Sequence, residues 1–201
     1  MTKQVAIYLY DQVEVLDFAG PYEVFTTASR VYQRLHPQKP IPFAVKLLAA
    51  ECSPVEARGG FRVLPDYLYS GCLEVDVLIV PGGVVDQELE RDELLSWIAD
   101  ISRSTEITAS ICTGSFILAA AGLLSGLRAT SHWEDLGAFS EMFPGVRVVD
   151  DRRWVEEGRL ITSAGISAGI DMSLQIVSRL EGRDLAERTA RQMDYSWQSS
   201  P

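Results

Sequence analysis

Histidine and cysteine are scarce in this sequence. Its 201 residues contain two histidines and three cysteines (Cys52, Cys72 and Cys112), and neither a CxxC pair nor a paired-histidine spacing occurs. These shortages argue against a dedicated metal site, and we expect neither a metal nor an organic cofactor. An odd, sparse set of cysteines without a secretory leader is typical of reduced thiols, so we expect a cytoplasmic protein.

Basic residues are in deficit, and long hydrophobic runs are missing. Lys and Arg number 18 against 28 Asp and Glu, which gives a formal net charge of −10. Nucleic-acid binding needs a basic face, so we expect no nucleic-acid partner. The longest apolar runs are too short to span a bilayer, so we expect no membrane association either. A hydrophobic content of 47% is ordinary for a globular chain and predicts one domain over residues 1–201.

Short apolar runs alternate with stretches of helical periodicity along the chain. We expect strands at residues 5–10, 43–50, 75–80, 106–111, 127–130, 147–149, 154–156 and 160–162, and a hairpin arm at 59–64. Helices are expected from Pro21, at the first helical position, toward Leu35, and at residues 94–101, 116–124, 172–180 and 185–195. The alternation predicts an α/β fold of the flavodoxin-like three-layer type, with helices on both faces of a mostly parallel sheet.

Cys112 stands where the expected strand 106–111 turns into the helix 116–124. Such a turn pushes the residue out of the fold and exposes it at the carboxyl edge of the sheet, and the helix that follows directs its positive dipole end at the sulfur. Both effects favour the thiolate and predict a pKa below the roughly 8.5 of a free cysteine. The arrangement resembles a nucleophile elbow with Cys in place of Ser, although it lacks the Gly two residues earlier. The alternative is a small buried cysteine that ends a core strand.

Paired glycines follow the strand 75–80, at the edge where ligands bind in open α/β sheets. Gly82 and Gly83 allow their backbone N–H groups to approach a ligand closely. Together with the N–H of Thr113 they would form an oxyanion-type site. The alternative interpretation of these glycines is a plain turn.

His132 follows the expected strand 127–130. Ser131 and Glu134 match a capping box, which predicts that a helix starts here with His132 in its first turn. A helix N-terminus disfavours protonation, so we expect a neutral imidazole that acts as a base or as an orienting partner for a thiol. The alternative is a histidine that only hydrogen-bonds a loop.

Asp17 lies between the first expected strand and the first expected helix, flanked by Leu16 and Phe18. Partial desolvation between two apolar residues would raise its pKa and suit it to proton transfer. The alternative is a turn or capping residue for the helix beginning at Pro21. Glu14 is a rival carboxylate one turn earlier.

Five segments together resemble the ThiJ/PfpI superfamily, which has the class I glutamine amidotransferase-like fold. They are residues 16–21 (LDFAGP), 79–83 (IVPGG), 110–115 (SICTGS), 129–133 (ATSHW) and 162–171 (TSAGISAGID). The resemblance covers nearly the whole chain. Within the superfamily the chain is most similar to the isocyanide hydratases, which convert R–N≡C and water into an N-substituted formamide. It is also similar to the amidotransferase-like domain of certain AraC-type regulators.

The resemblance implies roles for individual residues. In the hydratases the elbow cysteine is the nucleophile, which matches Cys112, and the next residue is Thr, which matches Thr113. An Asp before the first helix handles the proton, which matches Asp17. His132 then lines the pocket, and the turn at Ile166 lies near the site.

The same resemblance places two residues of the last amphipathic helix. Ser167 is expected to be its N-cap. Asp171, one turn further, is expected on the helix surface or at an interface rather than in catalysis.

The resemblance also separates the functional alternatives. Protease-like members carry His directly after the nucleophile, so Thr113 argues against proteolysis. Regulators continue into a helix-turn-helix domain, and with the sequence ending at Pro201 we expect none. We therefore expect a small-molecule hydro-lyase, with a redox or ligand sensor and a glyoxalase- or deglycase-like enzyme as alternatives. Because glyoxalase-type members need a Glu where Asp17 stands, that reading is weaker.

The superfamily usually forms dimers, so the resemblance implies a homodimer. The arm at 59–64 and the first helix near residues 22–32 carry the apolar side chains expected at its interface.

Overall fold

The computed structural model describes residues 1–71 and 74–200, so Cys72 lies outside the described residues. A seven-stranded sheet in the order β10-β11-β7-β6-β1-β2-β5 forms its centre. Its strands are β1 (Lys3–Tyr8), β2 (Phe43–Ala49), β5 (Tyr67–Leu68), β6 (Val77–Val80), β7 (Ile107–Ile111), β10 (Trp154–Glu157) and β11 (Leu160–Ser163). Every pairing is parallel except that of β10 with β11. The mostly parallel sheet expected from the sequence is confirmed.

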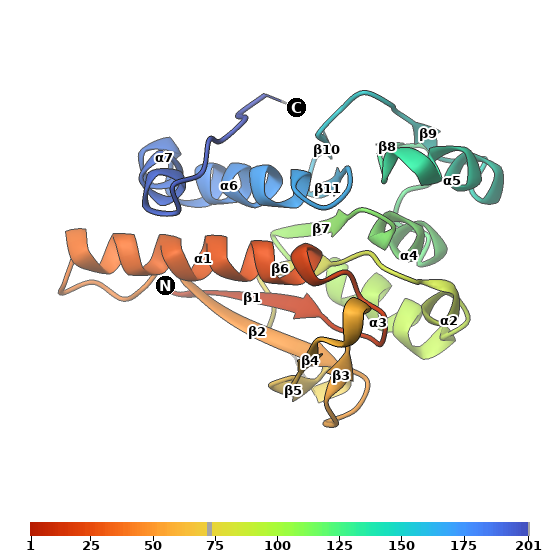
Figure 1. Cartoon of the computed structure of the whole chain (residues 1–201), viewed down its shortest axis with the longest axis horizontal. Coiled ribbons are helices and arrows are strands. Elements are labelled where there is room, and N and C mark those ends of the chain that lie inside the picture. Colours follow the sequence, from red (N-terminus) through yellow and green to blue (C-terminus); the bar gives the residue numbers. More distant parts are fainter. Residues whose placement is uncertain (72–73, 201) are drawn as a thin grey trace.

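Helices cover both faces of this sheet (Figure 1). The helices α1 (Val15–Leu35), α6 (Ala168–Glu181) and α7 (Arg183–Gln192) pack against one another, and α1 also contacts β1 and β2. A second group is formed by α2 (Asp86–Leu89), α3 (Asp92–Ser102) and α4 (Gly114–Ala120), with α4 on β6 and β7. The helix α5 (Leu136–Met142) lies next to β9 (Arg147–Val148). The three-layer α/β fold is therefore confirmed.

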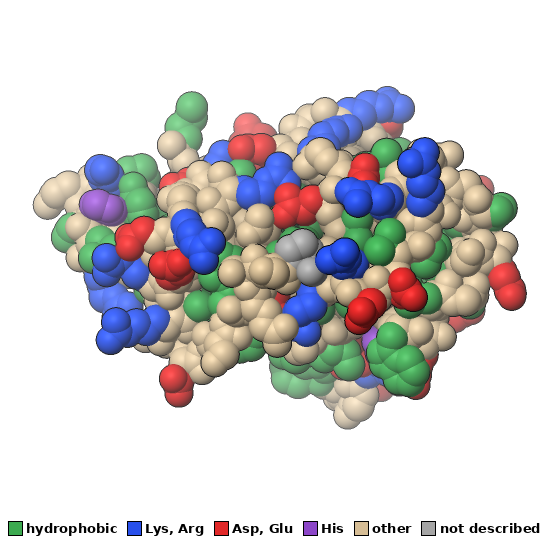
Figure 2. Space-filling model, turned by 90° about the horizontal axis from the view of Figure 1, so that it is seen from above, with side chains coloured by type: hydrophobic (Ala, Val, Ile, Leu, Met, Phe, Trp, Pro, Cys, Tyr) green, Lys and Arg blue, Asp and Glu red, His purple; other side chains and the backbone are tan. Residues whose placement is uncertain are grey.

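Burial explains why the central strands could be identified from the sequence. All residues of β6 and β7 are buried, as are the last four of β1. A parallel strand that is covered on both faces needs a compact side chain at nearly every position, which produces a continuous apolar run. On the face seen from above α6 and α7, by contrast, basic and acidic side chains are interspersed (Figure 2).

A small hairpin packs against the start of α1. It consists of β3 (Val55–Glu56) and β4 (Arg62–Val63), joined by a short 3₁₀ turn at Arg58–Gly60. The N–H of Gln12 donates to the carbonyl of Glu56, and the N–H of Arg58 donates to the carbonyl of Val13. The expected arm at 59–64 is thus present, although its first strand begins at Val55. A second small sheet pairs β8 (Arg128–Ala129) with β9, and further 3₁₀ turns lie at Tyr69–Gly71 and Trp133–Asp135.

The helix α1 begins at Val15, so the expectation that Pro21 occupies the first helical position is wrong. Pro21 lies inside the helix, where it removes the hydrogen bond to the carbonyl four residues earlier. The first turn is held from outside instead, because the N–H of Glu14 donates to the carbonyl of Gly82 at 2.8 Å. Glu14 is the N-cap residue, and Asp17 lies within the first turn.

Asp171 is buried, so the expectation of a surface or interface position is wrong. Its Oδ2 lies 2.5 Å from the Arg153 guanidinium, and its Oδ1 accepts the N–H of Gln198 at 3.0 Å. Its backbone carbonyl accepts the indole N–H of Trp197. The carboxylate therefore fastens the segment after α7 to α6, through partners that no local sequence pattern could indicate.

Candidate active site

Cys112 forms a strained elbow between β7 and α4. Its φ angle is 55°, in the left-handed region that non-glycine residues rarely occupy. Its N–H donates to the carbonyl of Ser163, and its own carbonyl accepts the hydroxyls of Ser115 at 3.1 Å and Ser131 at 3.0 Å. These bonds hold the backbone in its strained conformation. The elbow geometry expected from the sequence is confirmed, although the side chain is 8% exposed rather than pushed into solvent.

Ser131 does not form the predicted capping box. Its hydroxyl donates to Cys112 instead, and no side-chain hydrogen bond caps the helix that follows. The N-cap position falls to His132, which precedes the 3₁₀ turn Trp133–Asp135 and then α5. Ser131 and Glu134 have the spacing of a capping box, but the Ser131 hydroxyl bonds the buried carbonyl of Cys112, which is distant in sequence.

Asp17 is fully buried at the start of α1. Its Oδ2 accepts the N–H of Gly82 at 3.0 Å, while the buried Oδ1 has no hydrogen-bond partner of normal geometry. Burial, with a smaller contribution from the charge of Glu14, raises the pKa of this carboxyl group from 3.8 to about 7, against the lowering effect of the Gly82 N–H. The expected desolvation of Asp17 is therefore confirmed. The capping alternative is not, because the carboxyl group bonds the β6 loop rather than its own helix.

The thiol of Cys112 faces the same carboxyl group and contributes, as a weak donor, to lowering the pKa of Asp17. In return, burial and then the charge of Asp17 raise the pKa of the thiol to about 12. The Thr113 N–H and hydroxyl favour the thiolate but are outweighed. The expectation of a thiol pKa below that of free cysteine is therefore wrong, because the dipole of α4 competes with a buried site and a nearby carboxylate.

The N–H groups of the paired glycines bond Asp17 and Thr113, so they do not form an open oxyanion site. The Gly83 N–H donates to Oγ1 of Thr113 at 2.9 Å, and that hydroxyl donates back to the Gly83 carbonyl at 2.9 Å. The Gly82 N–H is used by Asp17. Of the three N–H groups that the sequence suggested, the one that faces the Cys112 sulfur is that of Thr113. A Cβ on Gly82 would lie 2.7 Å from Cβ of Cys112, so the close approach requires glycine.

His132 lines the site without a hydrogen bond to Cys112 or Asp17 within the described residues. Its ring lies against Gly165, where any Cβ would collide with it. Its Nδ1 is 3.4 Å from the carboxylate of Asp135. This position fits the expected pocket role better than that of a base acting directly on the thiol.

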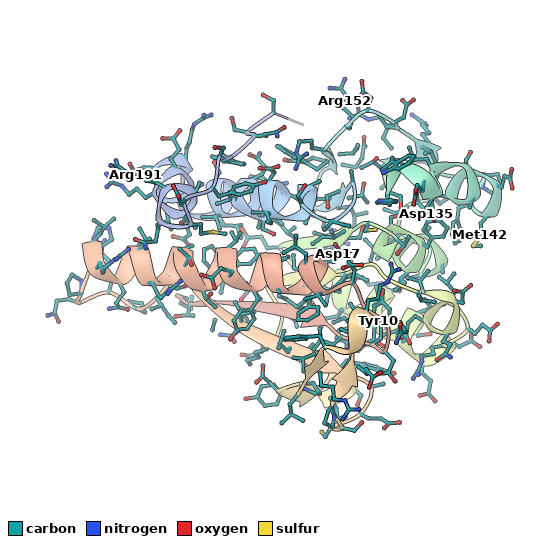
Figure 3. All side chains as sticks on the ribbon, viewed as in Figure 1. Tyr10, Asp17, Asp135, Met142, Arg152 and Arg191 are labelled. Carbon is teal, nitrogen blue, oxygen red and sulfur yellow. The ribbon has the colours of Figure 1, made fainter. Side chains whose placement is uncertain are left out.

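Two further residues complete the constellation. Ile166 has a φ of 52°, and its N–H contributes to lowering the pKa of Asp17, so the expected proximity of this turn is confirmed. Tyr10, which the sequence interpretation missed, is buried and donates its hydroxyl to the carbonyl of Pro81 at 3.1 Å. Tyr10, Asp17 and Asp135 come from three separate segments and lie in the right-hand half of the view (Figure 3).

Large apolar side chains adjoin the site residues along the chain and are exposed to solvent. They are Leu16 beside Asp17, Val84 beside Gly83, Trp133 beside His132, and Ile166 itself. We call these four residues the apolar rim. A site that combines a buried polar centre with exposed apolar groups suits a small organic substrate.

Neither a metal centre nor a membrane segment is found in the part of the chain that the structure describes. Within residues 1–71 and 74–200, no three His, Cys, Asp or Glu side chains are placed to hold a metal ion. Over the same residues, no helix has the length and apolar character needed to cross a bilayer.

Known proteins are similar to this chain over most of its length. The model of the DJ-1/PfpI family matches residues 3–179. An isonitrile hydratase of Pseudomonas putida is 33% identical over 198 residues, which cover 98% of this chain and 80% of the relative. The regulator CdhR of Pseudomonas aeruginosa, of the HTH type, is 31% identical over 96% of this chain, which spans 55% of the regulator. A solved ThiJ/PfpI family protein from Pseudomonas syringae superposes with a TM-score of 0.84 at 29% identity, covering 98% of this chain and 76% of that one.

Proposed function

The chain belongs to the DJ-1/PfpI family, and we propose that within it the protein is a cysteine-dependent hydro-lyase that hydrates small isonitriles. The observation that carries the proposal is the pair formed by Cys112 and Asp17. A thiol on a strained elbow faces a buried carboxyl group whose pKa is raised to about 7. A carboxyl group with such a pKa can both accept and return a proton near neutral pH.

In the first step the Cys112 sulfur adds to the terminal carbon of R–N≡C. The S–C bond forms, and the thiol proton passes through the Asp17 carboxylate to the same carbon, which gives the thioimidate Cys–S–CH=N–R. Asp17 ends this step ionised, as it began. The Thr113 N–H holds negative charge on the sulfur while its proton is in transit.

In the second step water adds to the thioimidate carbon. Asp17 takes one proton from the water and delivers it to nitrogen, while the hydroxyl stays on carbon. The C–S bond then breaks, and Asp17 carries the hydroxyl proton to the sulfur. The products are R–NH–CHO and the free thiol, so one water is consumed and no redox change occurs.

The apolar rim supports a substrate with an apolar substituent. An isonitrile carbon must reach the buried sulfur, and the exposed side chains of this rim are the apolar groups that R could meet outside it. Apolar R groups gain contact there without leaving polar groups unpaired.

The direct test is formamide production from alkyl and aryl isonitriles, followed by NMR. We expect turnover by the wild type, none by Cys112→Ala, and full activity in Cys52→Ser, since Cys52 is exposed whereas Cys112 is buried. Equal formamide production by wild type and Cys112→Ala would contradict the proposal.

A binding module without turnover is the second candidate, because the similarity to CdhR covers almost the entire chain. It predicts saturable binding of a small ligand at the site and no product from isonitriles. Methylglyoxal turnover would instead favour the reactive-carbonyl enzyme. A redox sensor based on Cys112 predicts oxidation of this thiol by peroxide, without turnover of isonitriles.

A further inference from the structure

One peptide group connects Tyr10 to Asp17. The hydroxyl of Tyr10 donates to the carbonyl oxygen of Pro81, and the N–H of the same peptide unit, that of Gly82, donates to Oδ2 of Asp17. The two bonds are 3.1 and 3.0 Å long, and both are buried. The two bonds and the peptide between them link Tyr10, which follows β1, through the loop after β6 to Asp17 in the first turn of α1.

We propose that Tyr10 is a positioning residue for Asp17: by bonding the Pro81 carbonyl it fixes the Pro81–Gly82 peptide and strengthens the hydrogen bond from Gly82 to the carboxylate. The physical basis is cooperativity, because a donor on a carbonyl polarises the peptide and makes its N–H a better donor. The inference rests on the proposed function for its kinetic consequence, but its structural part concerns Asp17 alone.

Asp17 depends on this single peptide. The Gly82 N–H makes the one full hydrogen bond to its carboxyl group within the described residues, because Oδ1 has no partner of normal geometry. The other groups that face Asp17 are the Glu14 carboxylate, which raises its pKa, and the Cys112 thiol and Ile166 N–H, which lower it weakly. Among these groups, all within the described part of the chain, none supplies a positive charge to replace the amide.

The Tyr10 hydroxyl is itself held in place. Its ring stacks on that of Tyr8, with centroids 5.7 Å apart. The hydroxyl of Tyr8 is occupied by the buried carboxyl group of Glu88 at 2.5 Å. The hydroxyls of Tyr8 and Tyr10 therefore bond different groups, the Glu88 carboxyl group and the Pro81 carbonyl. This difference makes Tyr8 a matched control for Tyr10.

The test is Tyr10→Phe compared with Tyr8→Phe. A hydrogen bond to a charged group contributes about 1.5–3 kcal/mol, and cooperativity about 10–30% of that. Removal of the Tyr10 hydroxyl should therefore move the titration of Asp17 to higher pH by about 0.1–0.7 unit. Two readouts are used: the ¹³C carboxyl shift of Asp17 by NMR, which needs no substrate, and the acid limb of kcat/KM for isonitrile hydration. We expect both to move in Tyr10→Phe and neither in Tyr8→Phe.

The NMR readout separates the two claims. An unchanged Asp17 titration in folded Tyr10→Phe overturns the positioning role, whatever the kinetics show. A shifted titration in a protein that hydrates no isonitrile supports the role of Tyr10 and removes the proposed function instead.

A second variant covers the case in which Tyr10→Phe does not fold. Incorporation of 3-fluorotyrosine at position 10 retains the shape and makes the hydroxyl a stronger donor. The Asp17 titration should then move to lower pH, opposite to the Phe variant. A shift in the alkaline direction, or none, overturns the inference.

Discussion

The carboxyl group of Asp17 and the thiol of Cys112 titrate as one buried pair. Burial raises the pKa of both, and the charge of Asp17 further raises that of the thiol. With values of about 7 and about 12, the pair carries a single proton between these limits. Which atom carries it is a property of the pair. The proposed reaction uses this state, since one proton must travel from sulfur to carbon and a free carboxylate oxygen must transport it.

The first prediction concerns pH. Below about pH 7 the Asp17 carboxylate is protonated and can no longer accept the proton of the Cys112 thiol. The value of kcat/KM for hydration should therefore rise with pH through about 7. Stopped-flow or NMR assays from pH 5 to 9 measure this limb. Glu14→Gln is the control: it removes a negative charge that raises the pKa of Asp17, so the limb should move to lower pH. A limb near the ordinary aspartate value of about 4 contradicts the assignment.

The second prediction is that Asp17→Asn separates turnover from thiol reactivity. Loss of a positioned proton-transfer group should lower the hydration rate about a hundredfold or more. The same change removes the charge that raises the pKa of Cys112, so alkylation of Cys112 should begin at lower pH than in the wild type. Mass spectrometry of the alkylated cysteines measures both proteins. Alkylation of the exposed Cys52 serves as the internal reference.

A purely structural role for Asp17, limited to its bond with the Gly82 N–H, predicts a different result for the same variant. Near-normal turnover, with an unchanged alkylation profile at Cys112, would assign Asp17 to structure alone.

The third prediction concerns stability. Asp17 binds its proton more tightly in the folded state, where its pKa is about 7, than in the unfolded chain at 3.8. The folded state therefore loses stability as pH rises from about 4 to about 7, by up to about 4 kcal/mol from this group. Urea unfolding at pH 4.5 and pH 8 should show the decline in the wild type, and a flatter dependence in Asp17→Asn. An equal pH dependence of the free energy of unfolding in both proteins would show that folding does not raise the pKa of Asp17.

The sequence predicts those features of the site that depend on residues close together in the chain. The elbow at Cys112 follows from a strand that meets a helix, and the raised pKa of Asp17 follows from its apolar neighbours. Partners distant in sequence are not visible in this way. The thiol pKa is reversed by Asp17, and the Gly83 N–H is taken by the Thr113 hydroxyl.

Two wrong boundaries have the same origin. By its local preference, Pro21 should occupy the first position of a helix. In the structure the Gly82 carbonyl accepts the N–H of Glu14, and α1 already begins at Val15. The capping pattern of Ser131 and Glu134 is likewise overridden, because the Cys112 carbonyl needs a donor in the interior. In each case a backbone group from a turn distant in sequence, at Gly82 or Cys112, satisfies a bond that the local pattern assigned elsewhere.

The last prediction concerns assembly. We propose that the protein is a homodimer formed through α1 and the β3–β4 hairpin. Phe61 and Leu64 on the hairpin segment and Tyr22 on α1 are exposed. The ring of Phe61 also meets Phe18 of α1, with centroids 6.4 Å apart, so hairpin and helix present one surface. Burial of these groups against a second copy would remove them from water at about 25 cal/mol per Å².

Sedimentation should therefore give about twice the chain mass of 22.2 kDa. Leu64→Asp should yield a monomer, because a charge on the shared surface would be buried unpaired. Met142→Asp is the matched control: Met142 is also exposed but belongs to α5, away from the hairpin (Figure 3), so this variant should remain dimeric. A wild type that sediments as a 22.2 kDa species at micromolar concentration refutes the dimer. Equal dissociation by both variants would place the interface elsewhere.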